Sequence, residues 1–100
     1  MAAYIIVTYD IDDAEAYAAY VPGVLPTLAK HGVEILVADY EAQRLEGRPR
    51  QVNVVLKFES EEAAMNWYND PEYAPAKQIR LDSTKNGMAV LAKQFEMPSQ

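Results

Sequence analysis

The sequence predicts an α+β fold in which four strands form one antiparallel sheet and two helical regions cover one of its faces. Strand and helix patterns follow one another in the order βαββαβ, and right-handed crossovers leave few topologies for that order. The 100 residues provide enough buried surface for one core but not two. The commonest topology with this order is the ferredoxin-like sandwich. We therefore expect a single domain over residues 1–100, with its core at about residues 4–93 and a polar C-terminal tail at residues 94–100.

The first predicted strand, Tyr4–Tyr9, is rich in β-branched and aromatic residues, which favour strands. Both of its faces are apolar, with Ile6 on one face and Ile5 and Val7 on the other. The second predicted strand, Val33–Tyr40, is nearly as apolar on both faces. In an antiparallel sheet with one solvent-exposed face, apolar and polar residues alternate more clearly along each strand. Because two helices cover only one face, we expect a second copy of the chain to cover the other, which predicts a homodimer.

The first helix is expected to begin at Asp13, with Asp12 as its N-cap and Glu15 three residues later completing a capping box. Pro22 and a second proline four residues later each remove an amide donor and crowd the preceding turn. These prolines predict a kink or a break of the helix near Val21.

Glycines and polar segments mark the next boundaries. Gly32 is expected to end the first helix in a left-handed conformation. The polar segment Glu41–Arg50 indicates a loop or an irregular hairpin arm before the third strand, Gln51–Phe58. Asn86-Gly87 predicts a turn before the last strand, Met88–Lys93.

The second helical region is expected to begin after Ser60, a favourable N-cap residue. Glu61 and Glu62 follow in the first turn, where the helix dipole favours negative charge. Asp70 and Pro71 predict a restart of this helix, with Asp70 as the N-cap and Pro71 at the first helical position.

The composition argues against several classes of protein. A net charge of −6 disfavours binding to nucleic acids and to anionic membranes. The absence of cysteine and the single histidine exclude a disulfide framework and a multi-histidine metal site within one chain. The sequence has no apolar run of about 18 residues and no basic start of a signal peptide. We expect a cytoplasmic protein with no cofactor, no metal, no nucleic-acid partner and no membrane contact.

The second helical region also carries a motif, which Arg80 follows. The motif runs Phe58-x-Ser60-x-Glu62-Ala63-Ala64-x-x-Trp67-Tyr68-x-x-Pro71-Glu72-Tyr73. With it, the chain resembles the family catalogued as domain of unknown function 1330, and supporting matches are Asp10, Tyr17 and Tyr20. The resemblance implies a dimeric α+β barrel, in which two ferredoxin-like sheets pack face to face. Relatives in that superfamily include small monooxygenases, isomerases and cyclases that hold a flat, oxygenated substrate without a bound cofactor.

Tyrosines of the helical regions and one arginine are the candidates for ligand binding. Five aromatic residues can line an apolar pocket, in which the tyrosine hydroxyls would orient a polar ligand: Tyr17, Tyr20, Trp67, Tyr68 and Tyr73. Arg80 can hold a carboxylate in bidentate fashion. The alternative for the tyrosines is ordinary packing of helices onto the sheet. The alternative for Arg80 is an ion pair with an acidic residue earlier in the chain, Glu72 or Asp70.

His31 and Asp10 are the candidates for acid–base catalysis. His31 is the only side chain whose unperturbed pKa lies near neutrality, and its alternative is a role at the end of a helix. Asp10 follows the first strand at the end of the sheet, and its alternative is a turn residue. Three further cations gather in one loop, where they can bind an anion, contact the partner subunit or remain solvated: Arg44, Arg48 and Arg50.

Together these patterns favour a homodimeric small-molecule-binding protein with a pocket between each sheet and its helices. By analogy of fold, it would be a cofactor-independent enzyme, similar to a monooxygenase, isomerase or cyclase, that acts on a flat oxygenated or aromatic metabolite. The alternative is a non-catalytic binding or assembly module with no substrate, whose aromatic residues only fill the core.

Overall fold

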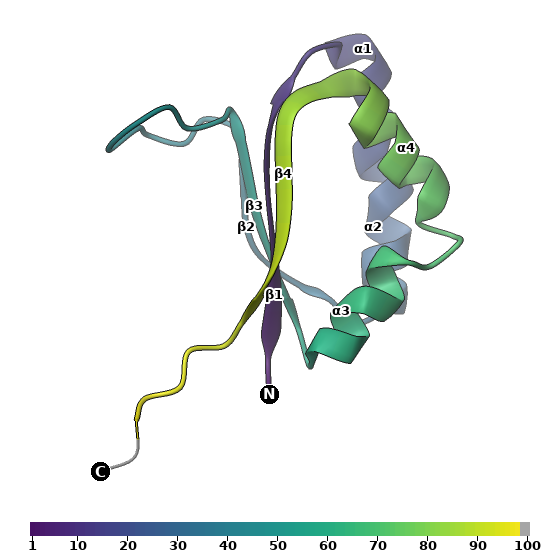
Figure 1. Ribbon diagram of the computed structural model, residues 1–100. Coiled ribbons are helices and arrows are strands. Elements are labelled where there is room, and N and C mark those ends of the chain that lie inside the picture. The colour runs from purple at the N-terminus through teal and green to yellow at the C-terminus, as the bar shows by residue number, and fades with distance from the viewer. Residues whose placement is uncertain (99–100) are drawn as a thin grey trace.

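The structure, a computed structural model, describes residues 1–98 (Figure 1). Its elements follow one another as β1 (Ala3–Ile11), α1 (Ala14–Tyr17), α2 (Tyr20–Lys30), β2 (Glu34–Asp39), β3 (Val52–Phe58), α3 (Glu61–Tyr68), α4 (Ala74–Ser83) and β4 (Thr84–Lys93). Each of the two predicted helical regions is therefore divided into two helices. Of the predicted tail, residues 99–100 lie outside the described residues.

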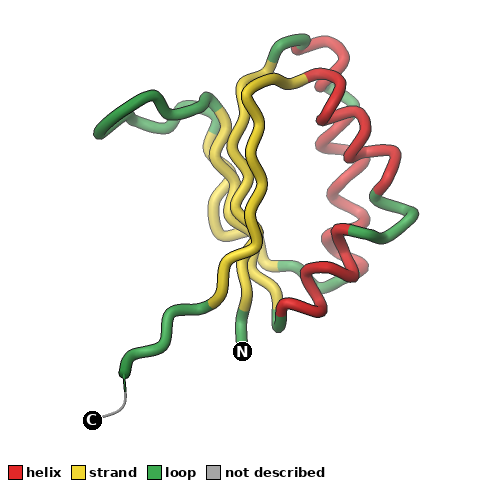
Figure 2. The backbone as a smooth tube through the Cα atoms, viewed as in Figure 1, coloured by secondary structure: helices red, strands yellow, loops and turns green. Residues whose placement is uncertain are grey.

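The four strands form one antiparallel sheet with the order β2-β3-β1-β4, which confirms the ferredoxin-like fold. The helices lie together on one face of this sheet, and no helix of residues 1–98 covers the opposite face (Figures 1 and 2). We call the face toward the helices the inner face and the opposite face the outer face. Within the same residues, no helix is both long enough and apolar enough to cross a membrane.

The N-cap of the first helix is Asp13, so the prediction of Asp12 is wrong by one residue. The Asp13 carboxylate accepts a hydrogen bond from the N–H of Ala16 at 3.1 Å. The backbone N–H groups of Asp12 and Asp13 both donate to the carbonyl of Ser83, which holds this segment against the end of α4. The Asp12 carboxylate lies 3.3 Å from Nζ of Lys85 instead of capping the helix.

The break in the first helical region lies at residues 18–19, before the position predicted near Val21. Pro22 is the third residue of α2, and in the first turn its missing N–H removes no helical hydrogen bond. The chain therefore restarts its helix before the proline. At the other end of α2, Gly32 has φ 63° and its N–H donates to the carbonyl of Ala29, which confirms the left-handed cap.

Ser60 caps α3 as predicted, because its hydroxyl oxygen accepts a backbone N–H of the first turn at 3.0 Å. The prediction that Asp70 caps the next helix is wrong, because α4 has Tyr73 as its N-cap. The Asp70 carboxylate accepts the N–H of Glu72 at 2.9 Å. It thus closes a turn that contains Pro71, one step before α4 begins.

Asn86 and Gly87 do not form the predicted turn, because both lie inside β4. The pairing of β4 with β1 shifts its register between Thr8 and Asp10, so one extra residue of β4 has to be accommodated there. Asn86, at φ 57°, lies at this bulge, and asparagine tolerates the left-handed region. Its side-chain amide donates to Oδ2 of Asp10 at 3.0 Å, which holds the bulge against β1.

The inner face of the sheet carries the core. Ile5, Val7 and Tyr9 alternate along β1, and all three are buried under the helices. Trp67 of α3 is only 2% exposed and packs against Phe58. The inner face therefore has its cover within the same chain.

The outer face carries an apolar row that crosses all four strands. In register, Val37 of β2 pairs with Val55 of β3, Val55 pairs with Ile6 of β1, and Ile6 pairs with Val90 of β4. The two ends of this row are 41% and 42% exposed, and Met88 beside it is 54% exposed. This is the second apolar face that the sequence of the strands predicts.

Candidate functional site

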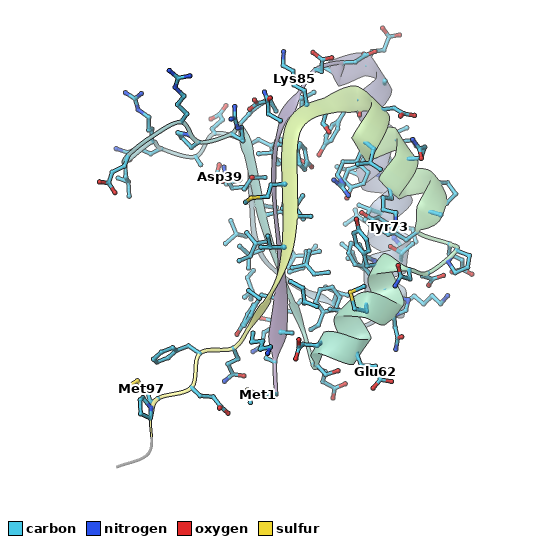
Figure 3. The ribbon with its side chains drawn as sticks, in the orientation of Figure 1. Met1, Asp39, Glu62, Tyr73, Lys85 and Met97 are labelled. Carbon is cyan, nitrogen blue, oxygen red and sulfur yellow. The ribbon has the colours of Figure 1, made fainter. Side chains whose placement is uncertain are left out.

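A cavity of about 100 Å³ lies between the inner face of the sheet and the helices α2, α3 and α4. Three exposed residues of its lining, Val21, Leu25 and Ile35, place its opening between α2 and the edge strand β2. Tyr73 points from the helix layer toward the sheet (Figure 3). Besides Trp67, the polar side chains of the lining are those of Tyr9, Tyr20, Tyr40, Tyr68, Tyr73 and Arg80.

Arg80 reaches the cavity because it lies on the buried stripe of α4. Tyr73, Ala76, Arg80 and Ser83 recur at helical spacing and are all buried. Only 5% of Arg80 is exposed to solvent. The Arg80 Cζ lies 6.0 Å from the centre of the Tyr9 ring, so the guanidinium faces an aromatic wall.

The Arg80 guanidinium forms no ion pair with a carboxylate of residues 1–98. Its Nε is buried and has no hydrogen-bond partner among these residues. The predicted alternative, an ion pair with Asp70 or Glu72, does not form, because Nζ of Lys30 holds these two carboxylates at 2.9 and 3.0 Å. Burial lowers the pKa of Arg80, but the surrounding phenols, Tyr73 first, raise that pKa by more. Arg80 is thus a buried cation without a counter-ion in the described chain.

Three phenols form a hydrogen-bonded chain beside this cation. The hydroxyls of Tyr9 and Tyr17 are 2.5 Å apart, and those of Tyr17 and Tyr40 are 2.9 Å apart. Tyr9 and Tyr40 line the cavity, and Tyr17 lies behind them. Burial raises the pKa of Tyr9 to about 12 and raises that of Tyr17 further. Tyr9 is therefore neutral near neutral pH, and its hydroxyl can donate a hydrogen bond to an oxygen of a ligand.

A second aromatic group completes the wall of the cavity. The Tyr20 and Tyr73 hydroxyls are 3.4 Å apart, and burial raises the pKa of Tyr20. The Tyr73 ring stacks on Trp67 with 4.2 Å between the ring centres, and the Trp67 N–H donates to Oγ1 of Thr27 at 2.9 Å. The structure thus brings together the predicted ligand-binding residues. All of them line the cavity except Tyr17, which is one hydrogen bond away.

His31, one of the two predicted catalytic residues, is not part of the cavity lining. It lies at the C-terminal end of α2, where its Nε2 is 2.7 Å from Oδ2 of Asp70. The same oxygen accepts a hydrogen bond from Nζ of Lys30. These bonds, first that of His31 and then that of Lys30, hold the pKa of Asp70 well below its usual range. The cluster fastens the end of α2 to the turn before α4.

Asp10, the other predicted catalytic residue, also lies outside the lining. Its Oδ2 accepts hydrogen bonds from Asn86 at 3.0 Å and Arg50 at 3.5 Å, and its Oδ1 accepts the N–H of Gln51 at 2.9 Å. The bond from Asn86, followed by that from Gln51, holds the pKa of Asp10 below its usual value. In this position Asp10 ties the segment before β3 to β1 and β4.

Two cavity residues, Tyr9 and Tyr40, are absent from the site predicted from the sequence. The alternation along β1 places Tyr9 on the same face as Ile5 and Val7, and this was a usable signal. Tyr40 follows β2, and its hydroxyl meets Tyr17 across a separation of 23 residues in the sequence. No spacing in the sequence indicates that contact.

Several solved structures share this fold. RPA0582, a protein of unknown function from Rhodopseudomonas palustris, has a TM-score of 0.79 at 17% identity, over 96% of this chain and 84% of that chain. A dimeric ferredoxin-like protein of unknown function from Jannaschia sp. CCS1 has a TM-score of 0.71 at 11% identity, over 94% and 100% of the two chains. SnoaB, a cofactor-independent oxygenase from Streptomyces nogalater, has a TM-score of 0.65 at 8% identity, over 99% and 98%. At these identities the likeness shows the fold alone.

The match to a family model is more specific than these likenesses. No curated protein matches the chain. The model of the domain of unknown function DUF1330 matches residues 2–94, which is nearly the whole sequence. The chain belongs to the DUF1330 family, as the motif around Trp67 predicts.

Proposed function

We propose that this DUF1330 protein is a homodimer that binds a small, flat, anionic ligand in the cavity of each protomer. The observation that supports an anionic ligand is that Arg80 is a buried cation without a carboxylate partner in residues 1–98. Burying an unpaired charge costs free energy, and a bound carboxylate or phenolate would offset that cost with charge-assisted hydrogen bonds.

The walls of the cavity support a flat ligand with a second oxygen. The aromatic rings of Trp67, Tyr20 and Tyr73 offer stacking and edge contacts to a ring-shaped molecule. The neutral hydroxyls near Arg80 can donate to a carbonyl, hydroxyl or ether oxygen of the same ligand. The ligand class that fits best is therefore an aromatic or otherwise flat, oxygenated carboxylate or phenol.

The test of the ligand site is a panel of aromatic carboxylates and phenols in a thermal-shift assay. At 100 times its dissociation constant, a ligand that binds stabilises the wild type by about 2.7 kcal/mol. We expect Arg80→Met to lose this stabilisation, and Lys85→Gln, which removes an exposed cation, to keep it. Equal stabilisation of the wild type and Arg80→Met by every binding ligand would reject Arg80 as the anion-binding group.

The homodimer is supported by the apolar row on the outer face. The row Val37–Val55–Ile6–Val90 is apolar along its whole length. The polar residue Asn53 lies beside the row on the same face, two residues before Val55 in β3. An apolar centre with a polar rim is typical of protein interfaces, and a stable one buries about 1,600 Å² in total. The similar structure from Jannaschia is described as dimeric, which adds support.

The dimer is tested with two variants, one that introduces a charge on the outer face and one that introduces a charge on the helix side. Ile6→Asp buries an unpaired carboxylate in the proposed interface, so this variant should sediment as a folded monomer. Leu81→Asp changes a half-exposed residue of α4 on the helix side and should leave the dimer intact. A wild-type mass of 11.2 kDa at micromolar concentration would reject the dimer.

A cofactor-independent reaction in the same cavity is the second candidate. It is supported by the fold shared with SnoaB and by the donors around the bound anion. Arg80 and the neutral phenols would stabilise an oxyanion that develops on the ligand. The lining contains no carboxylate and no imidazole of residues 1–98, so the residues around the ligand offer no strong base.

The reaction is tested by incubating each binding ligand with the wild type and with Arg80→Met in air. Ligand consumption and oxygen uptake are followed together. An enzyme is expected to consume at least one ligand, and Arg80→Met should slow this consumption. Binding without turnover across the panel would reject the enzyme and favour the non-catalytic binding module.

A further inference from the structure

Two segments leave the sheet on its outer side, away from the helices. One is the β2–β3 loop, residues 40–51, and the other is the C-terminal arm, residues 94–98. Figures 1 and 2 show them at opposite ends of the sheet, and Figure 3 shows Met97 on the arm. Both segments extend past the face that carries the apolar row.

Both segments expose large apolar side chains. Leu45 on the loop is 89% exposed, and Phe95 and Met97 on the arm are 76% and 78% exposed. Phe95 and Met97 are two residues apart in an extended segment, so they share one face of it. Exposed apolar groups that gather in this way indicate contact with a partner.

The two segments differ in charge, because the loop carries three arginines beside Glu41 and Glu46, whereas Glu96 is the one charged residue of positions 94–98. Arg44 and Arg48 of the loop are exposed and form no ion pair with residues 1–98, whereas Arg50 of the same loop is held by Asp10. The arm carries Glu96, which is also exposed and forms no such ion pair. The loop and the arm of one chain cannot meet, because a seven-residue strand such as β3 separates the two ends of the sheet by about 24 Å.

We propose that the C-terminal arm of each protomer docks on the β2–β3 loop of a second copy of the chain. This inference rests on the homodimer proposed above. The arm continues β4 at one edge of the sheet, and the loop joins β2 and β3 toward the other edge, so the two segments leave from diagonally opposite corners. A two-fold axis between the outer faces and perpendicular to the line that joins these corners brings the arm of one chain to the loop of the other. Glu96 then faces Arg44 and Arg48 of the second copy, and Phe95 and Met97 cover its Leu45.

The other way to stack the outer faces is disfavoured by charge. A two-fold axis along the line that joins the two corners would bring arm against arm and loop against loop. Glu96 would then face its own copy, and so would Arg44 and Arg48, which places like charges opposite one another. The loop cations therefore have a specific role, which is to set the orientation of the two sheets.

Charge reversal tests this pairing directly. We expect Glu96→Arg to raise the dimer dissociation constant about tenfold at low salt, because each reversal acts at two symmetric contacts. The double variant Arg44→Glu/Arg48→Glu should have a similar effect. All three substitutions together should return the constant to within about threefold of the wild type, because attraction is restored. Sedimentation velocity over a dilution series measures these constants.

The controls separate this inference from the dimer itself. Glu62→Arg reverses a charge on the helix side of the molecule (Figure 3) and should leave the dissociation constant unchanged. A chain that ends at Gln94 should fold, because it keeps the hydrogen bond from the Gln94 N–H to the Ala2 carbonyl, and should dimerise about a hundredfold more weakly.

Each outcome bears on one of the two proposals. A wild type that is monomeric overturns both the dimer and the docked arm. A dimeric wild type that is insensitive to the reversals, or a triple variant that fails to recover, overturns the docked arm alone and leaves the dimer and the ligand site in place.

Discussion

Two buried charges at the helix layer differ in how the fold treats them. Asp70 is 8% exposed and has partners on three sides, since it meets His31, Lys30 and the N–H of Glu72. Arg80 is 5% exposed, and no carboxylate of residues 1–98 pairs with it. Both lie in the second helical region, ten residues apart. The two carboxylates predicted as partners of Arg80, those of Asp70 and Glu72, are both held by Lys30.

This difference distinguishes a structural charge from a charge kept for a ligand. A buried carboxylate that is fully hydrogen-bonded fixes the geometry of the elements it joins, here the end of α2 and the turn before α4. A buried cation without a counter-ion weakens the folded state, and such exceptions gather at functional sites. The comparison therefore supports Arg80 as a ligand group and Asp70 as part of the scaffold.

Replacement of Trp67 should disturb both the scaffold of the helix layer and the cavity around Arg80, and it should have the largest effect. Its ring stacks on Tyr73 at the cavity, and its N–H donates to Thr27 of α2. We expect Trp67→Ala to lower the free energy of unfolding by about 3–5 kcal/mol, because it leaves a large void in the core and removes the hydrogen bond to Thr27. Urea denaturation measures this loss. A loss below about 1 kcal/mol would contradict the burial of the indole.

Replacement of Asp70 should harm only the scaffold. At neutral pH, Asp70→Asn should destabilise the protein, because His31 and Lys30 lose their carboxylate partner. The pKa of Asp70 in the folded protein lies below the value of about 3.9 of an unfolded aspartate. Its contribution is thus fully present above about pH 4 and is lost as the pH falls through the depressed pKa.

The measurement for Asp70 is the difference in free energy of unfolding between the wild type and Asp70→Asn as a function of pH. This difference should shrink as the pH falls below about 4. A difference that stays constant from neutral to acidic pH would mean that the charge of Asp70 contributes nothing. Ligand binding at neutral pH should survive in Asp70→Asn, which separates this site from the cavity.

Replacement of Arg80 should not lower the free energy of unfolding, in contrast to replacement of Asp70. Because the guanidinium is buried without a counter-ion, Arg80→Met should leave the free energy of unfolding unchanged or raise it by about 1 kcal/mol. The same variant should lose ligand binding, as proposed above. Thermal unfolding without ligand measures the effect on stability. A loss of more than about 2 kcal/mol would assign Arg80 to the scaffold, through its contact with the Tyr9 ring.

The sheet and the helix ends could be predicted because their signals are local. Ser60 and Gly32 act on the backbone within a few residues, and the alternation along β1 reports its two faces directly. The errors at Asp12 and Asn86 have a common cause. Both residues are held by contacts with distant segments, Asp12 by the Ser83 carbonyl and Asn86 by Asp10 of β1, and these contacts override the local preference.

The candidate site could be predicted only in part. The stripe along α4 and the aromatic residues indicate Tyr73 and Arg80, because helical spacing decides which side chains turn inward. The chemistry of His31 and Asp10 suggests catalysis equally well, but their hydrogen-bond partners lie about 40 residues away in the sequence. Only the folded chain shows that His31 meets Asp70, outside the lining of the cavity.

The smallest effect is expected from the phenol chain that borders Arg80. Tyr17→Phe removes the hydrogen bonds to Tyr9 and Tyr40 and keeps the ring that packs between them. The loss should be about 1 kcal/mol, because the buried Tyr9 hydroxyl loses its partner. Tyr40→Phe is the matched control and should cost less, because Tyr40 is half-exposed and water can replace its bond.

The pKa of Tyr9 gives a second measure of the same change. The hydrogen bond from Tyr17 lowers that pKa and thus opposes the effect of burial, so Tyr17→Phe should raise it above about 12. Absorbance of the phenolate during an alkaline titration follows this shift. An unchanged titration together with unchanged stability would mean that Tyr9 does not depend on Tyr17. The phenol chain would then be a packing contact rather than an ordered set of donors beside Arg80.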